Sequence, residues 1–297
     1  MKNLSRRNFI ATTAAAVALG TLAPSALGQK KRAIKKAIMF QTVNIKDTSV
    51  MEKFKLIKEA GFEGVEPLSH MDTKEVLEAA KETGLTICSV CCATHWAQPL
   101  SAPTPPAREK ALEGLKQALR DAKTYGTDSV LLVPAVVTKE VSYEDAYKRS
   151  QEQIRKAIPL AEELKVKISI ENVWNKFMFS PVEAARYVDE FNSPWVAWHL
   201  DLGNLINFGW PEHWIRTLNK RVARLHIKEF SREKASKEGA GAGFGVEFLK
   251  GDNDWPTIMK ALDEIGYTGW GIAEQGGANS AEGLKKLARE MDQIFAS

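Results

Sequence analysis

Four polar side chains stand where short apolar runs of the sequence end, and their types suggest a common chemistry. The runs read Lys-Ile-Ser-Ile-Glu171, Trp-His-Leu-Asp201, Arg-Leu-His226 and Gly-Ile-Ala-Glu274. Runs this apolar are usually buried, and a buried carboxylate costs much free energy unless a positive charge compensates it. Three carboxylates and one imidazole that converge on one point form a ligand set suited to a hard-to-borderline divalent cation.

The segments that must bring these residues together alternate between short apolar runs and longer amphipathic ones. Strand-like runs cover 37–43, 64–68, 85–92, 129–135, 167–173, 196–202, 222–228 and 269–274. Helical patterns cover 51–60, 74–83, 107–125, 143–164, 181–191, 211–219, 255–265 and 281–294. Continuous apolar strands that alternate with helices favour a parallel sheet covered on both faces. Eight such units predict one closed (β/α)8 barrel, the TIM barrel of the α/β class.

An open, doubly wound sheet is the alternative fold. It is disfavoured because no Gly-x-Gly-x-x-Gly sequence follows the first apolar run. No low-complexity linker divides the chain, so residues 29–297 are predicted to form a single catalytic barrel domain. The Gly-rich segment 231–254 is expected to be a long loop over one end of the barrel.

The barrel prediction gives the four polar residues a common location. In a TIM barrel the carboxyl ends of the strands form the functional face. Glu171, Asp201, His226 and Glu274 would end the fifth to eighth strands, which are neighbours in the ring. A salt bridge or a helix cap would explain any one of them alone. Four adjacent strand ends together favour a metal site.

Five segments around these positions carry a resemblance to a known family. They read Gly-Phe-Glu-Gly-Val-Glu66, Ile-Glu-Asn172, His-Leu-Asp-Leu-Gly-Asn204, His-Ile-Lys-Glu229 and Gly-Tyr-Thr-Gly-Trp-Gly-Ile-Ala-Glu274. From about Lys35 to its C-terminus the chain resembles the sugar phosphate isomerase/epimerase family of xylose isomerase-like barrels. That family includes hydroxypyruvate isomerase, the ketose 3-epimerases and endonuclease IV.

The resemblance implies a metal-dependent proton transfer. Glu171, Asp201, His226 and Glu274 would bind one divalent metal ion, and Glu171 and Glu274 would double as the acid–base pair. A divalent ion stabilises the enediolate that forms when a proton is removed next to a ketone. Two carboxylates on opposite faces can remove and return that proton. One imidazole with three carboxylates favours Mn²⁺ or Mg²⁺ over Co²⁺ or Zn²⁺.

Further residues are candidates for binding a carbohydrate substrate. Glu66 ends the second strand and is expected to bond sugar hydroxyls, with a loop salt bridge as the alternative. His95 and Trp96 follow the third strand and suit a sugar pocket, although a structural role is equally open for the histidine. Lys228 would neutralise an enediolate or a carboxylate, or else be solvated.

One position departs from the family pattern. The ketose epimerases and hydroxypyruvate isomerases carry a histidine shortly after the aspartate of the sixth strand. Here that stretch reads Leu202-Gly203-Asn204, so Asn204 is the candidate for a replaced substrate contact. Trp174, Trp210 and Trp255 would supply an aromatic wall, although core packing explains each of them as well.

The first 28 residues have the pattern of a twin-arginine signal peptide. The pair Arg6-Arg7 precedes a short apolar run, and small residues suit cleavage after Gly28. An N-terminal anchor helix is the alternative, but the run is too short to span a bilayer comfortably. The sequence therefore predicts a periplasmic protein without a stable membrane anchor after cleavage.

The charge balance excludes nucleic acid as an expected partner. The chain carries 41 basic and 37 acidic side chains, and loss of Lys2, Arg6 and Arg7 with the signal leaves 38 basic ones. A nearly neutral protein offers no electrostatic attraction to nucleic acid. Five histidines are also few for a histidine-rich site of the endonuclease IV type. The sequence does not indicate an oligomeric state.

The leading interpretation is a divalent-metal-dependent isomerase or epimerase of a sugar or keto-sugar. A 3-keto-glycoside lyase or hydratase would use the same site, with enolisation followed by expulsion of a leaving group. Export favours that alternative, because glycosides arrive from outside whereas sugar phosphates are mainly cytoplasmic. A non-catalytic periplasmic sugar-binding barrel is disfavoured because a binder needs no paired carboxylates around a metal.

Overall fold

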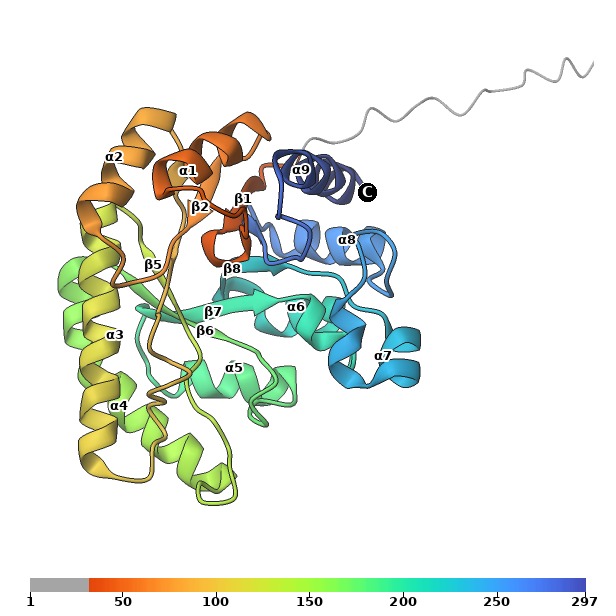
Figure 1. The fold of residues 1–297 in the computed structure, drawn as a ribbon. Helices are drawn as coiled ribbons and strands as arrows, with labels where there is room; N and C mark the ends of the chain where they lie inside the picture. The colour runs from red at the N-terminus through yellow and green to blue at the C-terminus, as the bar shows by residue number, and fades with distance from the viewer. Residues whose placement is uncertain (1–31) are drawn as a thin grey trace, which may run out of the picture. The chain divides into compact units, whose positions relative to one another are not determined.

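The computed structural model describes residues 32–297, and the predicted signal segment 1–28 lies outside the described residues. Within residues 32–297 one parallel sheet of nine strand segments is enclosed by helices (Figure 1). The segments are β1 (Lys35–Met39), β2 (Gly64–Glu66), β3 (Thr86–Ile87), β4 (Val90–Cys91), β5 (Ser129–Leu132), β6 (Lys167–Glu171), β7 (Val196–Asp201), β8 (Val222–Ile227) and β9 (Trp270–Ala273).

The third predicted strand, 85–92, is broken into β3 and β4, and this break closes the barrel. The strand order is β3-β2-β1-β9-β8-β7-β6-β5-β4, so the two halves stand at opposite ends of the sheet order. Cys91 N donates to Pro67 O at 2.9 Å, and Ser69 N donates to Cys91 O at 2.8 Å, which joins the two ends. At the break the Cys88 carbonyl accepts a hydrogen bond from Arg224 Nε. The eight predicted strands therefore form one ring, as expected for a TIM barrel.

Eight helices follow the predicted pattern and cover the outside of the ring. They are α1 (Val50–Glu59), α2 (Thr73–Thr83), α3 (Pro105–Tyr125), α4 (Tyr143–Leu164), α5 (Pro181–Asp189), α6 (Pro211–Leu218), α8 (Trp255–Ile265) and α9 (Ala281–Ala296). Glycines at 84, 126 and 266 end α2, α3 and α8 in the left-handed conformation, which glycine adopts without a steric penalty. No helix among residues 32–297 is long and apolar enough to cross a membrane.

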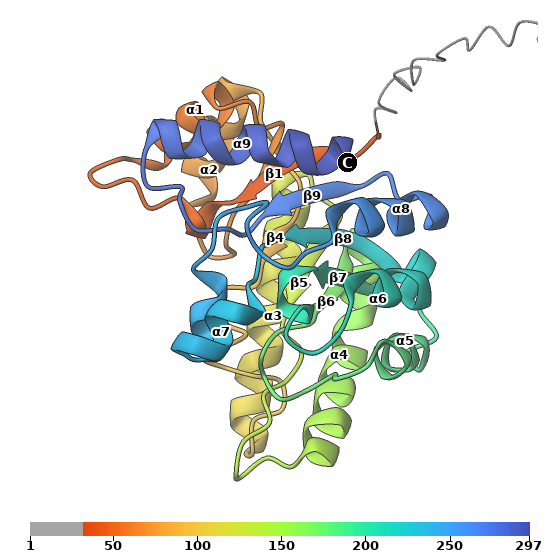
Figure 2. The same ribbon diagram turned by 90° about the vertical axis from the view of Figure 1, so that its right-hand side faces the viewer.

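The prediction of a plain loop over 231–254 is wrong, because this segment contains the short helix α7 (Arg232–Glu238). Ser231 caps the helix, with its side chain accepting a hydrogen bond from Lys234 N. The helix is followed by a 3-10 turn, 240–244, whose Phe244 ring lies 4.9 Å from the Phe230 ring. In both views α7 stands apart from the layer formed by α1, α2 and α9 (Figure 1, Figure 2). The loop prediction rested on the glycines of 239–245 and overlooked the helix-forming residues 232–238 that precede them.

Side chains alternate along each strand between the helices and the barrel interior. A large apolar cluster fills the space between sheet and helices and includes Ile38, Val130 and Ile168. A small cluster inside the ring contains Ala37, Met39, Cys88, Cys91, Leu131 and Ile272. This inner cluster is apolar, whereas the side chains at the carboxyl ends of β6–β9 are polar. The interior of the barrel is therefore an apolar core that becomes polar at the carboxyl ends of the strands.

Candidate metal centre and its cavity

The four predicted metal ligands come together at the carboxyl ends of adjacent strands. Glu171 and Asp201 end β6 and β7, His226 pairs with Asp201 in the strand register, and Glu274 directly follows β9. His226 Nδ1 lies 3.0 Å from Glu171 Oε1, 2.9 Å from Glu274 Oε2 and 3.8 Å from Asp201 Oδ2. One ligand atom from each residue lies within 4.8 Å of all the others.

The orientation of Asp201 is fixed by two asparagines. Asp201 N donates to Asn172 Oδ1 at 3.0 Å, and Asn172 Nδ2 donates to Asp201 O at 2.8 Å. Asn204 N donates to Asp201 Oδ1 at 2.8 Å. These contacts occupy one carboxylate oxygen and leave Oδ2 directed at the other ligands. Sequence reasoning missed the role of Asn172, although its place directly after Glu171 was a usable signal.

Glu66 lies beneath His226 and does not line the cavity. The Glu66 carboxylate is fully buried, and its Oε2 lies 2.9 Å from His226 Nε2. Contact with sugar hydroxyls was expected, but burial behind the histidine corrects this expectation. A carboxylate on the second nitrogen of a metal-binding histidine fixes the orientation of the ring. His199 is also fully buried, with its ring centre 4.3 Å from that of His226.

Lys228 places a positive charge against two of the carboxylates. Its Nζ lies 3.1 Å from Asp201 Oδ2 and 2.8 Å from Glu274 Oε2. Nevertheless, both oxygens are buried and accept no well-aligned hydrogen bond. Buried carboxylate oxygens that only cationic groups approach are suited to a cation, and the set of three carboxylates and one imidazole fits a divalent metal ion.

Burial and neighbouring charges shift the pKa values of the three carboxyl groups in opposite directions. Burial raises the pKa of Glu171 to about 7 and the pKa of Asp201 to about 6. Burial also opposes ionisation of Glu274, but Lys228 and His226 outweigh it and hold the pKa of Glu274 well below its usual value. His226 is buried too, yet Glu274 and Glu66 raise its pKa well above the ordinary range. Without a metal ion, the site thus favours a protonated imidazole.

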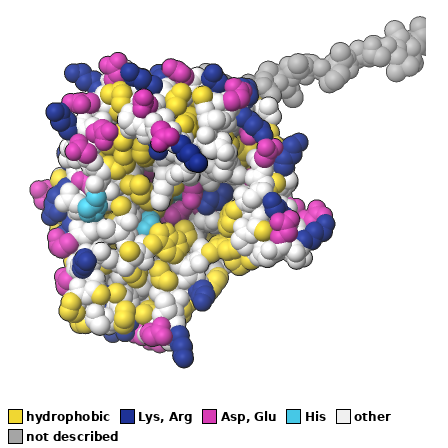
Figure 3. Space-filling view, in the orientation of Figure 1, with side chains coloured by type: hydrophobic (Ala, Val, Ile, Leu, Met, Phe, Trp, Pro, Cys, Tyr) yellow, Lys and Arg dark blue, Asp and Glu magenta, His cyan; other side chains and the backbone are white. Residues whose placement is uncertain are grey.

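The ligands lie at the floor of a cavity of about 470 Å³. Figure 3 shows a hollow in which acidic and basic side chains lie together, with hydrophobic side chains around it. The structure brings seven predicted site residues to this cavity, namely Glu171, His226, Glu274, His95, Trp96, Lys228 and Asn204. Asp201 and Glu66 do not line the cavity, but both lie next to His226 at its floor. The predicted residues therefore form one site at the functional face of the barrel.

His95 and Trp96 form one side of the cavity and differ in exposure. His95 is buried, and its Nδ1 accepts a hydrogen bond from Val133 N at 3.1 Å. Burial lowers the pKa of His95 to about 4, so the imidazole is neutral near pH 7. Trp96 is 52% exposed and packs edge-on against the His95 ring.

The three tryptophans that were candidates for an aromatic wall have different locations. Trp174 lines the cavity, and its Nε1 donates to Asn204 O at 3.0 Å. Trp255 is buried, and its Nε1 donates to Glu229 Oε2, so it belongs to the core. Trp210 is 57% exposed outside the cavity. Phe244, from the turn after α7, completes the wall and was not predicted.

Comparisons with known proteins agree with this architecture. A sequence model of the xylose isomerase-like TIM barrel family matches residues 54–294. The L-ribulose-5-phosphate 3-epimerase UlaE of Escherichia coli is 23% identical over 262 residues, or 83% of this chain and 89% of that protein. A D-psicose 3-epimerase determined in the presence of D-fructose has a TM-score of 0.72 at 15% identity, covering 89% of this chain and 100% of that one.

A second solved structure is similar to the same degree. The 3-keto-D-glucoside 4-epimerase YcjR from Escherichia coli has a TM-score of 0.72 at 17% identity. The match covers 88% of this chain and 98% of that one. At such identities the two structures establish a shared fold alone.

Proposed function

The chain belongs to the xylose isomerase-like TIM barrel family, and from this premise we propose that it is a divalent-metal-dependent isomerase or epimerase of a sugar or keto-sugar. The convergence of Glu171, Asp201, His226 and Glu274 at the floor of one cavity carries this proposal. The relative named as an L-ribulose-5-phosphate 3-epimerase supports the same class of reaction.

Glu171 and Glu274 are the proposed pair of carboxylates that exchange a proton with a substrate carbon. They stand at the first and last of four neighbouring strand ends, and both line the cavity. A sugar bound between them would present opposite faces of one carbon to the two carboxylates. One carboxylate removes the proton and the other returns a proton to the opposite face, which inverts the carbon. When bound, the metal ion would stabilise the negative charge that develops on the enediolate oxygens.

Lys228 supports the same reaction through its charge. Its ammonium group lines the cavity beside Asp201 and Glu274. A fixed positive charge in a site shielded from water stabilises an oxyanion strongly. The pair Glu66–His226 holds the imidazole in one orientation, so the ligand set is prearranged rather than assembled on binding.

The cavity wall favours a substrate without a phosphate group. Among the described residues that line it, Lys228 is the only lysine or arginine, and two carboxylates already contact it. A phosphate is usually held by several basic side chains or by a row of backbone N–H groups. We therefore propose an uncharged ketose or keto-glycoside as substrate, and Mn²⁺ or Mg²⁺ as the metal.

Export is a separate proposal that rests on the sequence of residues 1–28. The Arg6-Arg7 pair and the apolar run after it suit the twin-arginine route, which would place the folded enzyme in the periplasm. Cell fractionation of the full chain and of an Arg6→Lys, Arg7→Lys variant tests it. Periplasmic protein that is lost in the variant is expected, and equal amounts in both would contradict the proposal.

The reaction is tested by following solvent deuterium into a panel of ketoses and 3-keto-glycosides by NMR. The metal-loaded protein is compared with Glu171→Gln and Glu274→Gln, and with Glu247→Gln as a control at an exposed carboxylate. Deuterium at one carbon with an intact skeleton is expected, and each catalytic variant should lose it. Loss of an aglycone or of water would identify a lyase or hydratase. Metal binding without exchange on any substrate would indicate a binding protein.

A further inference from the structure

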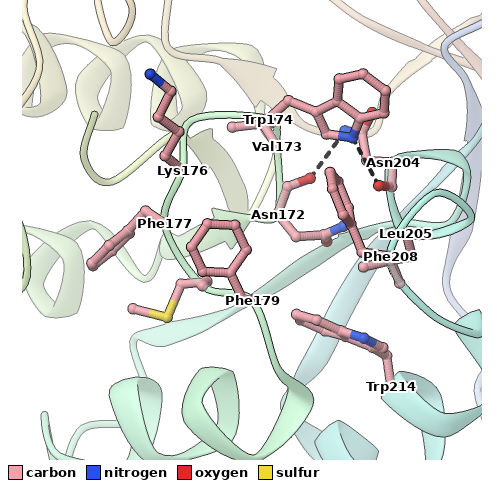
Figure 4. Close-up of a pocket in the computed structure, with 11 residues that line it drawn as sticks. Asn172, Val173, Trp174, Lys176, Phe177, Phe179, Asn204, Leu205, Phe208 and Trp214 are labelled. Carbon is pink, nitrogen blue, oxygen red and sulfur yellow. Dashed lines mark hydrogen bonds between the residues drawn. The ribbon is translucent and has the colours of Figure 1, made fainter. Parts of the chain in front are cut away.

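We call the cavity of about 470 Å³ that contains Glu171, His226 and Glu274 the metal cavity. A second cavity, of about 280 Å³, lies beside it and is built mainly from aromatic rings (Figure 4). It is formed by the loop after β6, by the segment after β7 and by α6. The rings that line it are Trp174, Phe177, Phe179, Phe208 and Trp214. We call these residues the aromatic pocket. Among residues 32–297, no acidic side chain lines the pocket, and Lys176 is the one charged residue on its wall.

The aromatic pocket shares a wall with the metal cavity. Val173, Trp174 and Asn204 line both spaces. The shared wall is held by two hydrogen bonds of 3.0 Å, from Trp174 Nε1 to Asn204 O and from Asn204 Nδ2 to Asn172 O (Figure 4). Asn172 also fixes Asp201, so the wall is tied to a metal ligand. The two spaces are therefore neighbours, separated by this wall, and a group attached to a sugar in the first would reach the second by passing the wall.

Two of the five rings of the pocket are exposed, whereas Phe177 and Trp214 are buried. Phe179 and Phe208 are 58% and 57% exposed. The loop before Phe179 contains two residues at left-handed φ, Lys176 and Met178, each with φ of 61°. This conformation costs on the order of 1 kcal/mol for a residue other than glycine. Exposed aromatic patches beside a cavity are typical of ligand-binding surfaces.

We propose that the aromatic pocket is a subsite for a planar, apolar group joined to the sugar, the aglycone of a glycoside. The inference rests on the proposed function, because the sugar must occupy the metal cavity for its aglycone to reach this pocket. The volume is smaller than that of a typical pocket for a whole drug-sized ligand, and it suits a group of one or two rings. The substrate class is thus an aryl keto-glycoside rather than a free ketose.

The proposal is tested with matched pairs of phenyl and methyl 3-keto-glycosides of several sugars, titrated calorimetrically into the full-length, metal-loaded protein. A phenyl ring that leaves water for an apolar pocket should improve affinity at least about tenfold over its methyl partner. Phe208→Ala and Phe179→Ala should each remove most of this gain. Trp210→Ala serves as the matched control, because this ring is equally exposed but lies outside the pocket.

Phenol, measured by saturation-transfer NMR, tests the pocket independently of the sugar. Phenol that binds the wild type and not Phe208→Ala, while no sugar binds in a metal-dependent manner, would retain the subsite and reject the proposed function. Equal affinities within every phenyl and methyl pair, with sugar binding intact, would reject the subsite alone. Absence of binding by phenol and by every phenyl glycoside would also overturn it. The subsite would also be rejected if the wild type were a dimer and Phe208→Ala a monomer, because the rings would then form a subunit interface.

Discussion

The metal cavity and the aromatic pocket adjoin each other, yet they are built in opposite ways. The metal cavity has charged residues at its floor, and they form ion pairs with one another. His226 lies between Glu66 and Glu171, and Lys228 contacts Asp201 and Glu274. The aromatic pocket consists of rings without charged partners, some of them half exposed. The first space is suited to chemistry on a polar carbon, and the second is suited to selection by shape and apolar area.

The two regions also differ in what positions their residues. The candidate metal ligands stand at the ends of β6, β7, β8 and β9, where the strand register positions them. The aromatic rings come mainly from the loops after β6 and β7. Barrel scaffolds hold catalytic groups on strand ends and vary specificity through loops. Changes at the strand ends should therefore affect metal binding and proton transfer, whereas changes at the exposed rings Phe179 and Phe208 should affect only ligand choice.

The largest effect is expected for Asp201→Asn. The asparagine keeps the hydrogen bond from Asn204 N but loses the negative charge directed at the metal site. Metal affinity should fall by more than the roughly 10- to 100-fold typical of residues that only orient a ligand. Proton exchange should fall to background. Asp121→Asn is the matched control, because Asp121 is a buried carboxylate in α3 that accepts hydrogen bonds away from the site. Equal metal affinity in both variants would show that Asp201 does not bind the metal.

Lys228→Met should separate charge stabilisation from metal binding. Loss of the ammonium group should reduce proton exchange by about 100- to 1000-fold, as for removal of one oxyanion donor. Metal affinity should not fall, because a positive charge beside Asp201 and Glu274 competes with a cation. Lys228→Arg retains the charge and should retain part of the exchange. A parallel loss of metal affinity and activity would show that Lys228 supports the ligands instead.

Glu66→Gln should have an intermediate effect, transmitted through His226. Without the carboxylate at 2.9 Å from Nε2, the imidazole loses its orienting partner. Metal affinity should fall about 10- to 100-fold, and the pKa of His226 in the metal-free protein should decrease, as NMR titration would reveal. Glu63→Gln, at an exposed glutamate just before β2, should change neither quantity. An unchanged His226 pKa in Glu66→Gln would contradict this role.

Metal binding should release protons, and its affinity should rise with pH. Burial raises the pKa of Glu171 to about 7 and that of Asp201 to about 6, and Glu274 and Glu66 keep His226 protonated despite its burial. A cation requires the deprotonated forms, so affinity should increase between about pH 6 and 8, near tenfold per unit for each proton released. Calorimetry in two buffers of different ionisation enthalpy measures the number of protons. Proton uptake on metal binding would contradict the prediction.

The smallest effect is expected for Phe208→Ala on metal binding and stability. Phe208 is 57% exposed and lines the aromatic pocket rather than the metal cavity, so metal affinity should stay within about twofold. The free energy of unfolding should change by less than about 1 kcal/mol, in contrast to the roughly 3–5 kcal/mol expected when a buried ring such as Trp214 is truncated. Thermal unfolding with and without metal checks both values. A loss of metal affinity in Phe208→Ala would show that the two regions are coupled.

Much of the fold was predictable because its signals are local. Strand and helix periodicity, with glycines at helix ends such as Gly84 and Gly126, identified eight units and hence the barrel. The convergence of the candidate metal ligands was predictable for the same reason, since Glu171 and Asp201 end apolar strands whose carboxyl ends must share one face. In these respects the sequence alone was sufficient.

Other features depended on how distant segments meet, which no local pattern encodes. Glu66 ends its strand like the metal ligands, but the ring places it beneath His226 instead of in the cavity. The break at Cys88 arises where one strand must join both ends of the sheet order. The aromatic pocket forms because Phe179 and Phe208, on separate loops, face a common space. Barrel closure and loop path thus decided which side chains became neighbours, because contacts across the ring depend on three-dimensional register rather than on sequence spacing.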